Sequence, residues 1–481
     1  MGQESIHRRE RLYIDGEWSE GADVIEVTDL ADGGSFAEVA AADTGQAERA
    51  LAAAERVKPA MRETTIPQRV EWLQNIADGL EDRKEELAEV IVREAGKPIS
   101  SARGEVDSAA ERFRRAVEEV RALKGEYREG TTDGHEGWRA IVKHEPIGAA
   151  LCITPYNYPL ATTALQVAPA LAAGNAVILK PASKTPISAA ILTEIVEEAG
   201  VPAGAFNFVP GQASVIGDKL SGDDRINAIA MTGSSGAGKH VAKESGMVNL
   251  HMELGGNAPA VVFEDADLDE AVSAAAKGSV KYAGQRCSAI SRVVVQESLH
   301  DELVEQLDAE LDAWTVGDLF EEETDLGPVI SEDQAEWIQT LVDDAVEKGA
   351  DLKRGGEYYE AKDGVFVYEP TLLANVPHDA RIVHEEQFGP VAAVTTFDSE
   401  EDALELVNES DLALDGSVFT KDYDRALRVA ERIDAGAVRI NGAPSHGLGD
   451  IPFGGNKDSG IGREGLHETI QDFLRKKSIV L

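Results

Sequence analysis

The sequence is poor in cysteine and in basic residues. Among its 481 residues there are only two cysteines, Cys152 and Cys287, which excludes a disulfide-stabilised secreted framework and predicts a reducing compartment, the cytoplasm. The 46 Lys and Arg residues stand against 88 Asp and Glu residues, which gives a formal net charge of −42. Because such a field repels nucleic acid and anionic membrane surfaces, we expect neither as a partner.

The sequence also lacks an apolar leader and a membrane-spanning run. The N-terminal residues "MGQESIHRRERLYIDGEW" are polar and contain no signal-peptide core. An Ala-rich stretch at residues 147–174 is interrupted by Pro155, Pro159 and Pro169, so it does not predict a membrane span. The acidic residues are spread along the whole chain rather than gathered in a tail. We interpret them as a surface that stays hydrated in concentrated salt, as in a halophile.

Between residues 148 and 254, short apolar strands alternate with helical patterns. One helix is expected over residues 160–173, closed by Gly174, and the next has Thr185 as N-cap, Pro186 at its first position and Gly200 beyond its end. Continuous apolar strands separated by helices predict a parallel sheet that is covered on both faces.

A second alternating stretch begins near residue 258. Asp267 and Glu270 indicate the start of a helix that runs to about Tyr282. Residues 1–120 are expected to be mostly helical after one short opening strand. Residues 137–146 and 473–481 each look like an isolated strand, which would need a partner from elsewhere, such as another subunit.

The stretch "MTGSSGAGKH" nearly matches a phosphate-binding P-loop. Gly233, Gly238 and Lys239 fit, but the Ser or Thr that would bind Mg²⁺ is replaced by His240. A nucleotide hydrolase is therefore disfavoured. Anion binding at a helix N-terminus, or a plain glycine-rich turn, remains as an interpretation.

Three further segments could carry chemistry. Cys287 in "YAGQRCSAI" lies beside Arg286, whose charge would favour the nucleophilic thiolate. Glu253 ends an apolar strand, where burial would raise its pKa toward that of a general base. Asn157 follows the first strand of the sheet, where its amide could donate to an oxyanion. Each residue alone also fits a structural role: a buried thiol, a strand-end carboxylate and a turn amide.

Taken together, these motifs resemble one family. "ILKPASKTP", "MTGSSGAG", "MELGGNAP", "GQRCSA", "EEQFGPV" and "PFGGNKDSGIGREG" are similar to the signature run of the NAD(P)-dependent aldehyde dehydrogenases. The resemblance implies that Cys287 attacks the aldehyde, that Asn157 and the Cys287 N–H hold the oxyanion, and that Glu253 activates the water that hydrolyses the thioester. A non-catalytic relative of the family and a P-loop hydrolase are the alternatives.

The resemblance also implies a domain organisation. We expect two Rossmann-like open parallel-sheet domains of the α/β class. Residues 1–121 and 146–254 would bind the dinucleotide, and residues 255–458 would form the catalytic domain. Residues 122–145 and 459–481 would form a small β extension that joins subunits into a homodimer or homotetramer.

The same resemblance gives the cofactor contacts. The expected set is Thr154, Pro155, Lys180, Ser183, Lys184, Gly211, Thr232, Gly233, Ser234, Leu254, Gly255, Glu386 and Phe388. NAD-preferring members carry Glu where this chain has Ser183. Serine removes the repulsion of a 2′-phosphate, and Lys180 and Lys184 could neutralise its charge. NADP is therefore favoured, with NAD as the second choice, and no metal is expected.

The substrate is expected to be a small polar aldehyde. Arg286 could recognise a phosphate or carboxylate, or it could point away. His446 and Phe453 lie in the segment that lines the substrate mouth in this family, which offers little aromatic bulk. The candidate substrates are lactaldehyde, glyceraldehyde or its 3-phosphate, and a sugar-derived semialdehyde.

Overall fold

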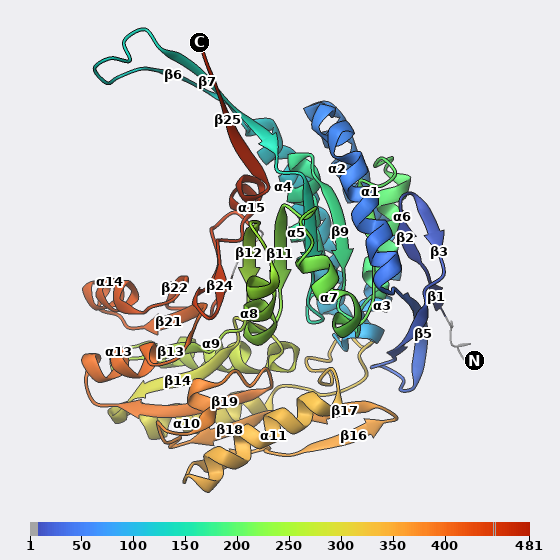
Figure 1. The fold of residues 1–481 in the computed structure, drawn as a ribbon. Coiled ribbons are helices and arrows are strands. Elements are labelled where there is room, and N and C mark those ends of the chain that lie inside the picture. Colours follow the sequence, from blue (N-terminus) through green and yellow to red (C-terminus); the bar gives the residue numbers. More distant parts are fainter. Residues whose placement is uncertain (1–7, 446, 448) are drawn as a thin grey trace.

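The computed structural model describes residues 8–445, 447 and 449–481, and it contains two large sheets and a projecting arm (Figure 1). One sheet has eight strands and the other has seven, and most neighbouring strands in both are parallel. The expected α/β class, with two open sheets and a small β extension, is confirmed. The division of the chain into the domain ranges given above stays a prediction.

Five short strands open the described chain where the sequence indicated one. They are β1 (Arg8–Glu10), β2 (Leu12–Ile14), β3 (Glu17–Ser19), β4 (Asp23–Thr28) and β5 (Ser35–Ala41). Strands β1, β4 and β5 form a separate small sheet, while β2 and β3 extend one edge of the eight-stranded sheet. Strands this short are stabilised by distant pairing partners rather than by their own pattern, which is why the sequence prediction missed them.

Four helices follow and confirm the predicted helical region. They are α1 (Thr44–Glu63), α2 (Ile66–Asp82), α3 (Lys84–Ala95) and α4 (Ile99–Ala122). Capping boxes begin α1 and α2. The side chains of Asp43 and Thr65 each accept the backbone N–H of the Gln three residues later, and that Gln side chain accepts the N–H of the capping residue. Helix α3 ends at Gly96, whose φ of 69° is the left-handed conformation that favours glycine.

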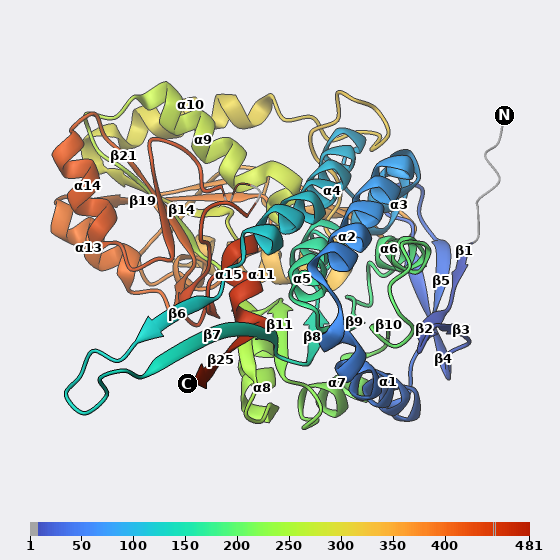
Figure 2. The same cartoon turned by 90° about the horizontal axis from the view of Figure 1, so that it is seen from above.

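The eight-stranded sheet has a parallel centre. Its strand order is β24-β12-β11-β8-β9-β10-β2-β3. The parallel strands and their connecting helices are β8 (Ala149–Ile153), α5 (Ala161–Ala173), β9 (Ala176–Lys180), α6 (Ile187–Glu198), β10 (Phe206–Phe208), α7 (Ala213–Ser221), β11 (Ala228–Thr232), α8 (Ser235–Glu244) and β12 (Asn249–Glu253). Helices α5 and α6 lie on one face with α2–α4, and α7 and α8 lie on the other with α1 (Figure 2). The predicted covered parallel sheet is confirmed.

The start of α6 corrects one sequence prediction. Pro186, not Thr185, is its N-cap, and no side chain of the cap itself binds the helix. The carboxylate of Glu94 on α3 accepts the N–H groups of Ile187 and Ser188 at 2.7 and 3.1 Å instead. A distant buried acid therefore replaces the local cap, which a local pattern cannot reveal.

The seven-stranded sheet is built from the second half of the chain. Its strands, in spatial order, are β15 (Asp351–Arg354), β18 (Thr371–Ala374), β19 (Val391–Phe397), β14 (Ile290–Gln296), β13 (Ala258–Val262), β21 (Asp415–Phe419) and β22 (Ala437–Ile440). Its helices are α9 (Leu268–Val280), α10 (His300–Asp312), α11 (Glu332–Glu347), α12 (Arg381–His384), α13 (Glu400–Asn408) and α14 (Tyr423–Arg432). Asp267 caps α9 as predicted, but α9 ends at Val280, two residues before the expected Tyr282.

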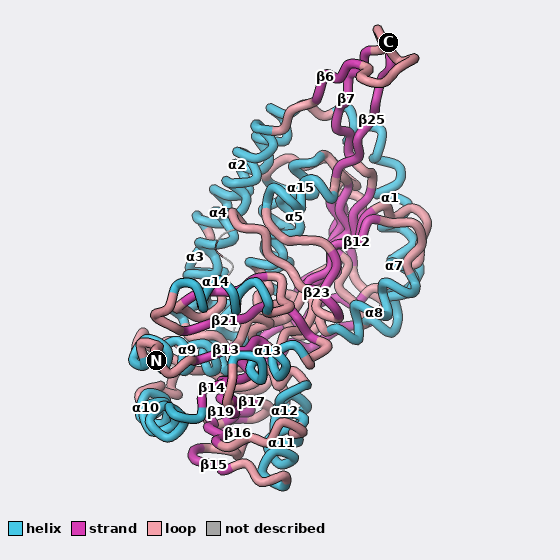
Figure 3. The backbone as a smooth tube through the Cα atoms, turned by 90° about the vertical axis from the view of Figure 1, so that its left-hand side faces the viewer, coloured by secondary structure: helices cyan, strands magenta, loops and turns pink. Residues whose placement is uncertain are grey.

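The remaining elements are short. They are the 3-10 turns η1 (Lys281–Gly284) and η2 (Glu297–Leu299), the hairpin β16 (Tyr358–Lys362) and β17 (Val365–Tyr368), and β20 (Leu412–Ala413), β23 (Asn456–Lys457) and β24 (Gly460–Ile461). Strand β23 lies between β12 and the strands β13 and β21 (Figure 3). The C-terminal segment thus passes through the junction of the two large sheets.

The arm consists of β6 (Glu126–Glu129), β7 (Arg139–Pro146) and β25 (Leu474–Val480), and α15 (Leu466–Asp472) precedes β25 (Figure 1). Strand β25 pairs antiparallel with β7 along its whole length, from Leu474 opposite Pro146 to Val480 opposite Ala140. The two segments expected to need outside partners therefore pair with each other. Local pattern could not show this, because more than 300 residues separate them.

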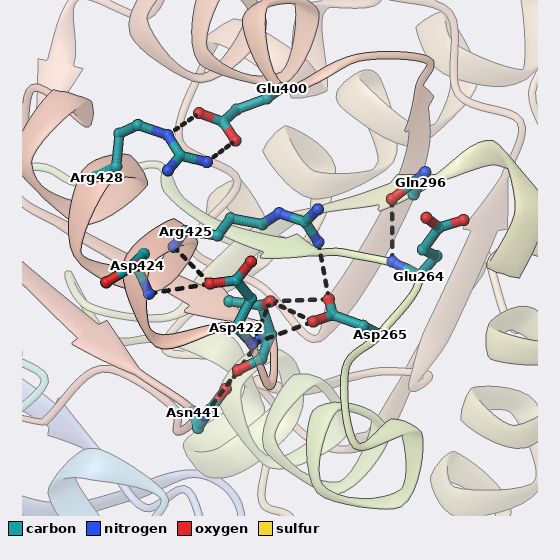
Figure 4. A network of polar contacts seen from close by, with 10 residues as sticks. Glu264, Asp265, Gln296, Glu400, Asp422, Asp424, Arg425, Arg428 and Asn441 are labelled. Atoms are coloured by element: carbon teal, nitrogen blue, oxygen red, sulfur yellow. Dashed lines mark hydrogen bonds and ion pairs between the residues drawn. The ribbon is translucent and has the colours of Figure 1, made fainter.

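Two arginines on α14 bind acidic side chains that lie beside the seven-stranded sheet, one after β13 and one on α13 (Figure 4). Arg425 donates to Asp265 at 3.0 Å, and Arg428 forms two contacts of 2.7 Å with Glu400. Both arginines therefore tie α14 to acids from other segments. Among the described residues no helix combines the length and apolar character that crossing a membrane requires, and no group of three or more His, Cys, Asp or Glu could hold a metal ion.

Candidate active site

The two large sheets meet at a four-residue connection, and the three candidate catalytic residues lie there. Glu253 is the last residue of β12 and Ala258 is the first of β13. Asn157 follows β8, and Cys287 lies three residues before β14. The Asn157 Nδ2 donates to the backbone oxygen of Gln285 at 2.9 Å, which joins the segment after β8 to the segment that carries Cys287.

The turn before Cys287 has a constrained backbone. Tyr282, Ala283 and Gly284 have φ values of 58°, 49° and 68°, all left-handed. Left-handed conformations are unfavourable for residues with a side chain and are concentrated at functional sites. A Cβ atom on Gly256 would lie 2.0 Å from the Cys287 oxygen, so glycine is required for this close approach. The turn and the glycine together fix the position of Cys287.

The thiol environment differs from the sequence expectation. The pKa of Cys287 is raised well above its usual value, chiefly by burial and then by the charges of Asp415, Glu386 and Glu253. Arg286 is not among the groups that act most strongly on this pKa. Its Nη2 donates to the oxygen of Gly278 at 2.5 Å, at the C-terminus of α9. The charge of Arg286 is thus placed at the end of a helix, and its expected effect on the thiolate stays a prediction.

Glu253 is a buried carboxyl, and the Arg463 charge and the Glu464 N–H near it only partly oppose the effect of burial on its pKa. It is 2% exposed, and neither of its side-chain oxygens has a hydrogen-bond partner among the described residues. Burial raises its pKa well above the usual value, and the charge of Glu464 raises it further. A carboxylate with a raised pKa and open acceptor positions has the properties of a general base for a bound water.

Helix α8 begins with an anion-binding geometry. Ser234 is its N-cap and its hydroxyl accepts the Ala237 N–H at 3.3 Å, and the Gly233 N–H donates to the backbone oxygen of Glu253 at 3.1 Å. Lys239 forms an ion pair with Asp458, and both side chains are partly exposed. The lysine is therefore bound to an acid on a neighbouring segment rather than placed over the helix N-terminus, which argues against a P-loop.

A second set of cofactor candidates surrounds the 254–257 connection. The Gly256 N–H donates to Glu386 Oε1 at 2.9 Å, and burial raises the pKa of Glu386 to about 7. A Cβ on Gly255 would lie 2.7 Å from the second Glu386 oxygen. Phe388 has a left-handed φ of 48°, and its ring meets that of Tyr156 edge-on at 5.9 Å. These residues pack closely, and a side chain at position 255 would collide with the Glu386 carboxylate.

Lys180 lies at the end of β9, where its ammonium is buried and burial lowers its pKa to about 8. Its Nζ donates to the backbone oxygen of Pro181 at 3.5 Å. The Ser183 hydroxyl donates to the Gly211 oxygen at 3.3 Å, while the Lys184 side chain is exposed. A buried ammonium with a single long contact is a group ready for a further acceptor.

The other candidate cofactor residues form hydrogen bonds with neighbouring strands, helices or loops. The Thr154 N–H donates to the Lys180 oxygen at 3.2 Å, and Pro155 follows it. Thr232 Oγ accepts from Gln166 Nε2 at 3.0 Å, and the Leu254 N–H donates to the oxygen of Ser459 at 2.9 Å. The candidate cofactor residues thus come together at one end of the parallel strands of the eight-stranded sheet.

Of the residues expected to bind the substrate at the mouth of the site, the structure describes one. Phe453 is buried, and its N–H donates to the Glu464 oxygen at 2.7 Å. His446 lies outside the described residues. Sequence reasoning missed Glu464 and Asp415, which both act on the electrostatics of the thiol. The motif "PFGGNKDSGIGREG" contains Glu464 and could have revealed it, whereas nothing local distinguishes Asp415 from the other acids of the chain.

Comparison with known proteins decides the family. The Aldehyde dehydrogenase family profile matches residues 18–479. The chain belongs to the aldehyde dehydrogenase family. This aldehyde dehydrogenase is an oxidoreductase that uses NAD(P) to oxidise aldehydes.

Individual relatives cover nearly the whole chain. The 3-sulfolactaldehyde dehydrogenase of Priestia aryabhattai is 36% identical over 472 residues, which are 98% of this chain and 97% of the relative. The lactaldehyde dehydrogenase of Methanocaldococcus jannaschii is 35% identical over 477 residues, 98% of this chain and 100% of the relative. Among solved structures, the NADP-dependent glyceraldehyde-3-phosphate dehydrogenase of Bacillus halodurans, complexed with NADP, aligns with a TM-score of 0.95 at 36% identity and covers 98% of this chain and 99% of that one.

Proposed function

We propose that this aldehyde dehydrogenase oxidises a small polar aldehyde to its carboxylic acid, with Cys287 as nucleophile and NADP as the preferred cofactor. One observation carries the assignment: Cys287, Asn157 and Glu253 meet at the junction of the two sheets, although they come from three separate segments. A thiol, an amide donor and a buried carboxyl are the three groups that oxidation through an acyl intermediate requires.

Each of the three residues has its own step in the reaction. Cys287 gives its thiol proton to water, its Sγ bonds to the aldehyde carbon, and the C=O π electrons move to the oxygen, which forms the oxyanion of a thiohemiacetal. The Asn157 amide and the Cys287 N–H are the donors that stabilise the oxyanion. Oxidation converts the thiohemiacetal into a thioester on Cys287. Glu253 then takes a proton from a water, the water oxygen bonds to the acyl carbon, and the carbon–sulfur bond breaks to release the acid.

The described residues fit a dinucleotide. The buried Lys180 ammonium and the Glu386 carboxylate supply ribose partners, and the N-terminus of α8 at Ser234 supplies N–H groups for phosphate. When bound, the dinucleotide serves as a hydride acceptor. Ser183 supports NADP, because no carboxylate stands at that position to repel a 2′-phosphate, and Lys184 is exposed beside it.

The assembly and location are part of the same proposal. The arm supports a homodimer or homotetramer, because its strands β6 and β25 have free edges and the side chains of Tyr127, Ile141 and Val480 are exposed. Both cysteines are free thiols, which supports a cytoplasmic location.

The test is formation of reduced nicotinamide in concentrated KCl by the wild-type enzyme and by Cys287→Ala. Each protein is given NAD or NADP with lactaldehyde, glyceraldehyde, glyceraldehyde 3-phosphate, 3-sulfolactaldehyde or succinate semialdehyde. We expect activity that the substitution abolishes, and a higher kcat/KM with NADP. Activity retained by Cys287→Ala would overturn the assignment of the nucleophile. The most active aldehyde would also show whether the substrate carries an anionic group.

A further inference from the structure

A buried ion pair lies behind the nucleophile turn. The Lys97 ammonium contacts the Glu105 carboxylate, and the two residues are 2% and 4% exposed. Lys97 is in the connection between α3 and α4, and Glu105 is on α4. Removing two charged groups from water is costly unless their remaining hydrogen-bond donors and acceptors also find partners. The further contacts of this pair therefore indicate what it stabilises.

Glu105 holds the segment that follows Asn157. Its Oε2 binds Lys97, and its Oε1 accepts the N–H groups of Leu160 and Ala161 at 3.0 and 3.1 Å. These N–H groups begin α5, where the helix N-terminus favours a negative charge. One oxygen of the carboxylate thus fixes the start of α5, whose first residue lies four residues after Asn157.

Lys97 holds two aromatic rings, one from each side of the site. Its Nζ lies 3.5 Å from the ring centroid of Tyr158 and 4.4 Å from that of Tyr282. The rings themselves meet edge-to-face, 5.9 Å apart. A buried ammonium over aromatic rings is a favourable cation–π arrangement. Tyr158 directly follows Asn157, and Tyr282 begins the left-handed turn that leads to Cys287.

Tyr282 is also bound at its other end. Its hydroxyl donates to the Ala95 oxygen at 2.9 Å, at the end of α3. The ring is therefore held by Ala95 and Lys97 from one connection of the chain. Because Tyr282 has an unfavourable left-handed backbone, such contacts are needed to keep the turn in place.

We propose that Lys97 is a positioning residue for the oxidation: by contacting Glu105, Tyr158 and Tyr282 together, it holds the Asn157 amide in register with Cys287. Among the described residues, no hydrogen bond or ion pair joins Lys97 to Cys287, Glu253 or Asn157. Lys97 therefore acts through the segments that carry them. This inference rests on the proposed roles of Cys287 and Asn157.

The test is a double-mutant cycle between Lys97→Met and Asn157→Ala, with kcat and KM measured for each form. If Lys97 acts by placing the Asn157 amide, Lys97→Met lowers kcat by about 10-fold to 100-fold, the range expected for a misplaced group. The same substitution in the Asn157→Ala background then costs less than about threefold, because the misplaced group is already absent. The KM of the cofactor is expected to change little.

Lys84→Met is the matched control. Lys84 pairs with Asp107 at 2.7 Å and so links α3 to α4 as Lys97 does, but on the surface. We expect Lys84→Met to retain the wild-type kcat. A second variant, Lys97→Gln, keeps a donor for Glu105 but removes the cation from the two rings, and it should show most of the loss of kcat. It decides the test alone if Lys97→Met does not fold.

Equal losses in both backgrounds, or an unchanged kcat in Lys97→Gln, would overturn the proposal. Failure of the proposed function gives a different result, because Cys287→Ala would then remain active whatever Lys97 does. The two outcomes are therefore separate.

Discussion

The Nδ2 of Asn157 donates to the backbone oxygen of Gln285 at 2.9 Å, two residues before Cys287. This bond connects the eight-stranded sheet to the segment that enters the seven-stranded sheet. It leaves the second N–H of the amide for another acceptor. The oxyanion donor and the nucleophile are thus held by one contact that spans the junction.

Replacing Asn157 by Ala should lower kcat about 10²-fold to 10³-fold, the usual cost of losing one oxyanion donor. The cofactor dissociation constant should stay near the wild-type value, because the amide acts on the aldehyde oxygen. Steady-state kinetics and cofactor titration of the same preparation check both expectations. A weakened cofactor affinity with an unchanged kcat would contradict the role of Asn157 as a donor to the oxyanion.

Replacing Glu253 by Gln should block hydrolysis of the thioester while leaving its formation intact. Rapid mixing should then show a burst of reduced cofactor of one equivalent per site, followed by a steady rate lower by about 10²-fold to 10⁴-fold. In the wild-type enzyme, the steady rate should fall as the pH drops below the raised pKa of Glu253, since only the deprotonated carboxylate accepts a proton. Absence of the burst would contradict this assignment.

The same substitution should affect stability in a pH-dependent way. Burial raises the pKa of Glu253 in the folded state above its unfolded value of about 4.3. The folded state therefore holds the proton more tightly, and the wild type loses stability as the pH rises from the unfolded value through the folded one. Glu253→Gln lacks this loss, so its melting temperature should exceed that of the wild type at pH 8 and converge with it toward pH 4. An equal difference at both pH values would contradict the linkage.

Replacing Gly256 by Ala should nearly abolish activity. The added Cβ would lie 2.0 Å from the Cys287 oxygen, so the segment that carries the nucleophile must move. A misplacement of about 1 Å already costs about 100-fold in rate. Gly104→Ala on α4 is the control, because a Cβ there meets nothing within 4 Å. That variant should keep full activity and gain up to about 1 kcal/mol in the free energy of unfolding. Similar kinetics for the two variants would refute the steric argument.

Replacing Ser183 by Glu should shift the cofactor preference from NADP to NAD. A carboxylate there would face the 2′-phosphate, and a like-charge contact worth more than about 1.4 kcal/mol raises the KM for NADP at least about tenfold. The KM for NAD serves as the internal control and should change little or improve. Equal changes for both cofactors would show that Ser183 does not distinguish them.

The net charge of −42 predicts that salt stabilises the enzyme. Raising KCl from about 0.1 M to about 2 M shortens the screening length severalfold, which reduces repulsion among surface carboxylates. The melting temperature should therefore rise over this range. A constant or falling melting temperature would contradict the halophilic interpretation.

The sequence predicted the strand–helix alternation well because that alternation is local. Helix α5 with Gly174, and the capping of α9 by Asp267, follow from neighbouring residues. Contacts between distant segments were not predictable. Glu94 replaces a local cap on α6 although it lies 93 residues before Ile187. The contact of Arg286 with Gly278 spans only eight residues, but it depends on how the left-handed turn between them folds back on α9.

The pairing of β25 with β7 has a consequence for biosynthesis. Residues 139–146 leave the ribosome long before residues 474–480 exist, so one edge of β7 stays without its partner until those residues have been synthesised. A polypeptide truncated before Leu474 would retain the residues proposed for catalysis but would expose that edge. The three-stranded arm is therefore completed only after the last of its strands along the chain has been synthesised.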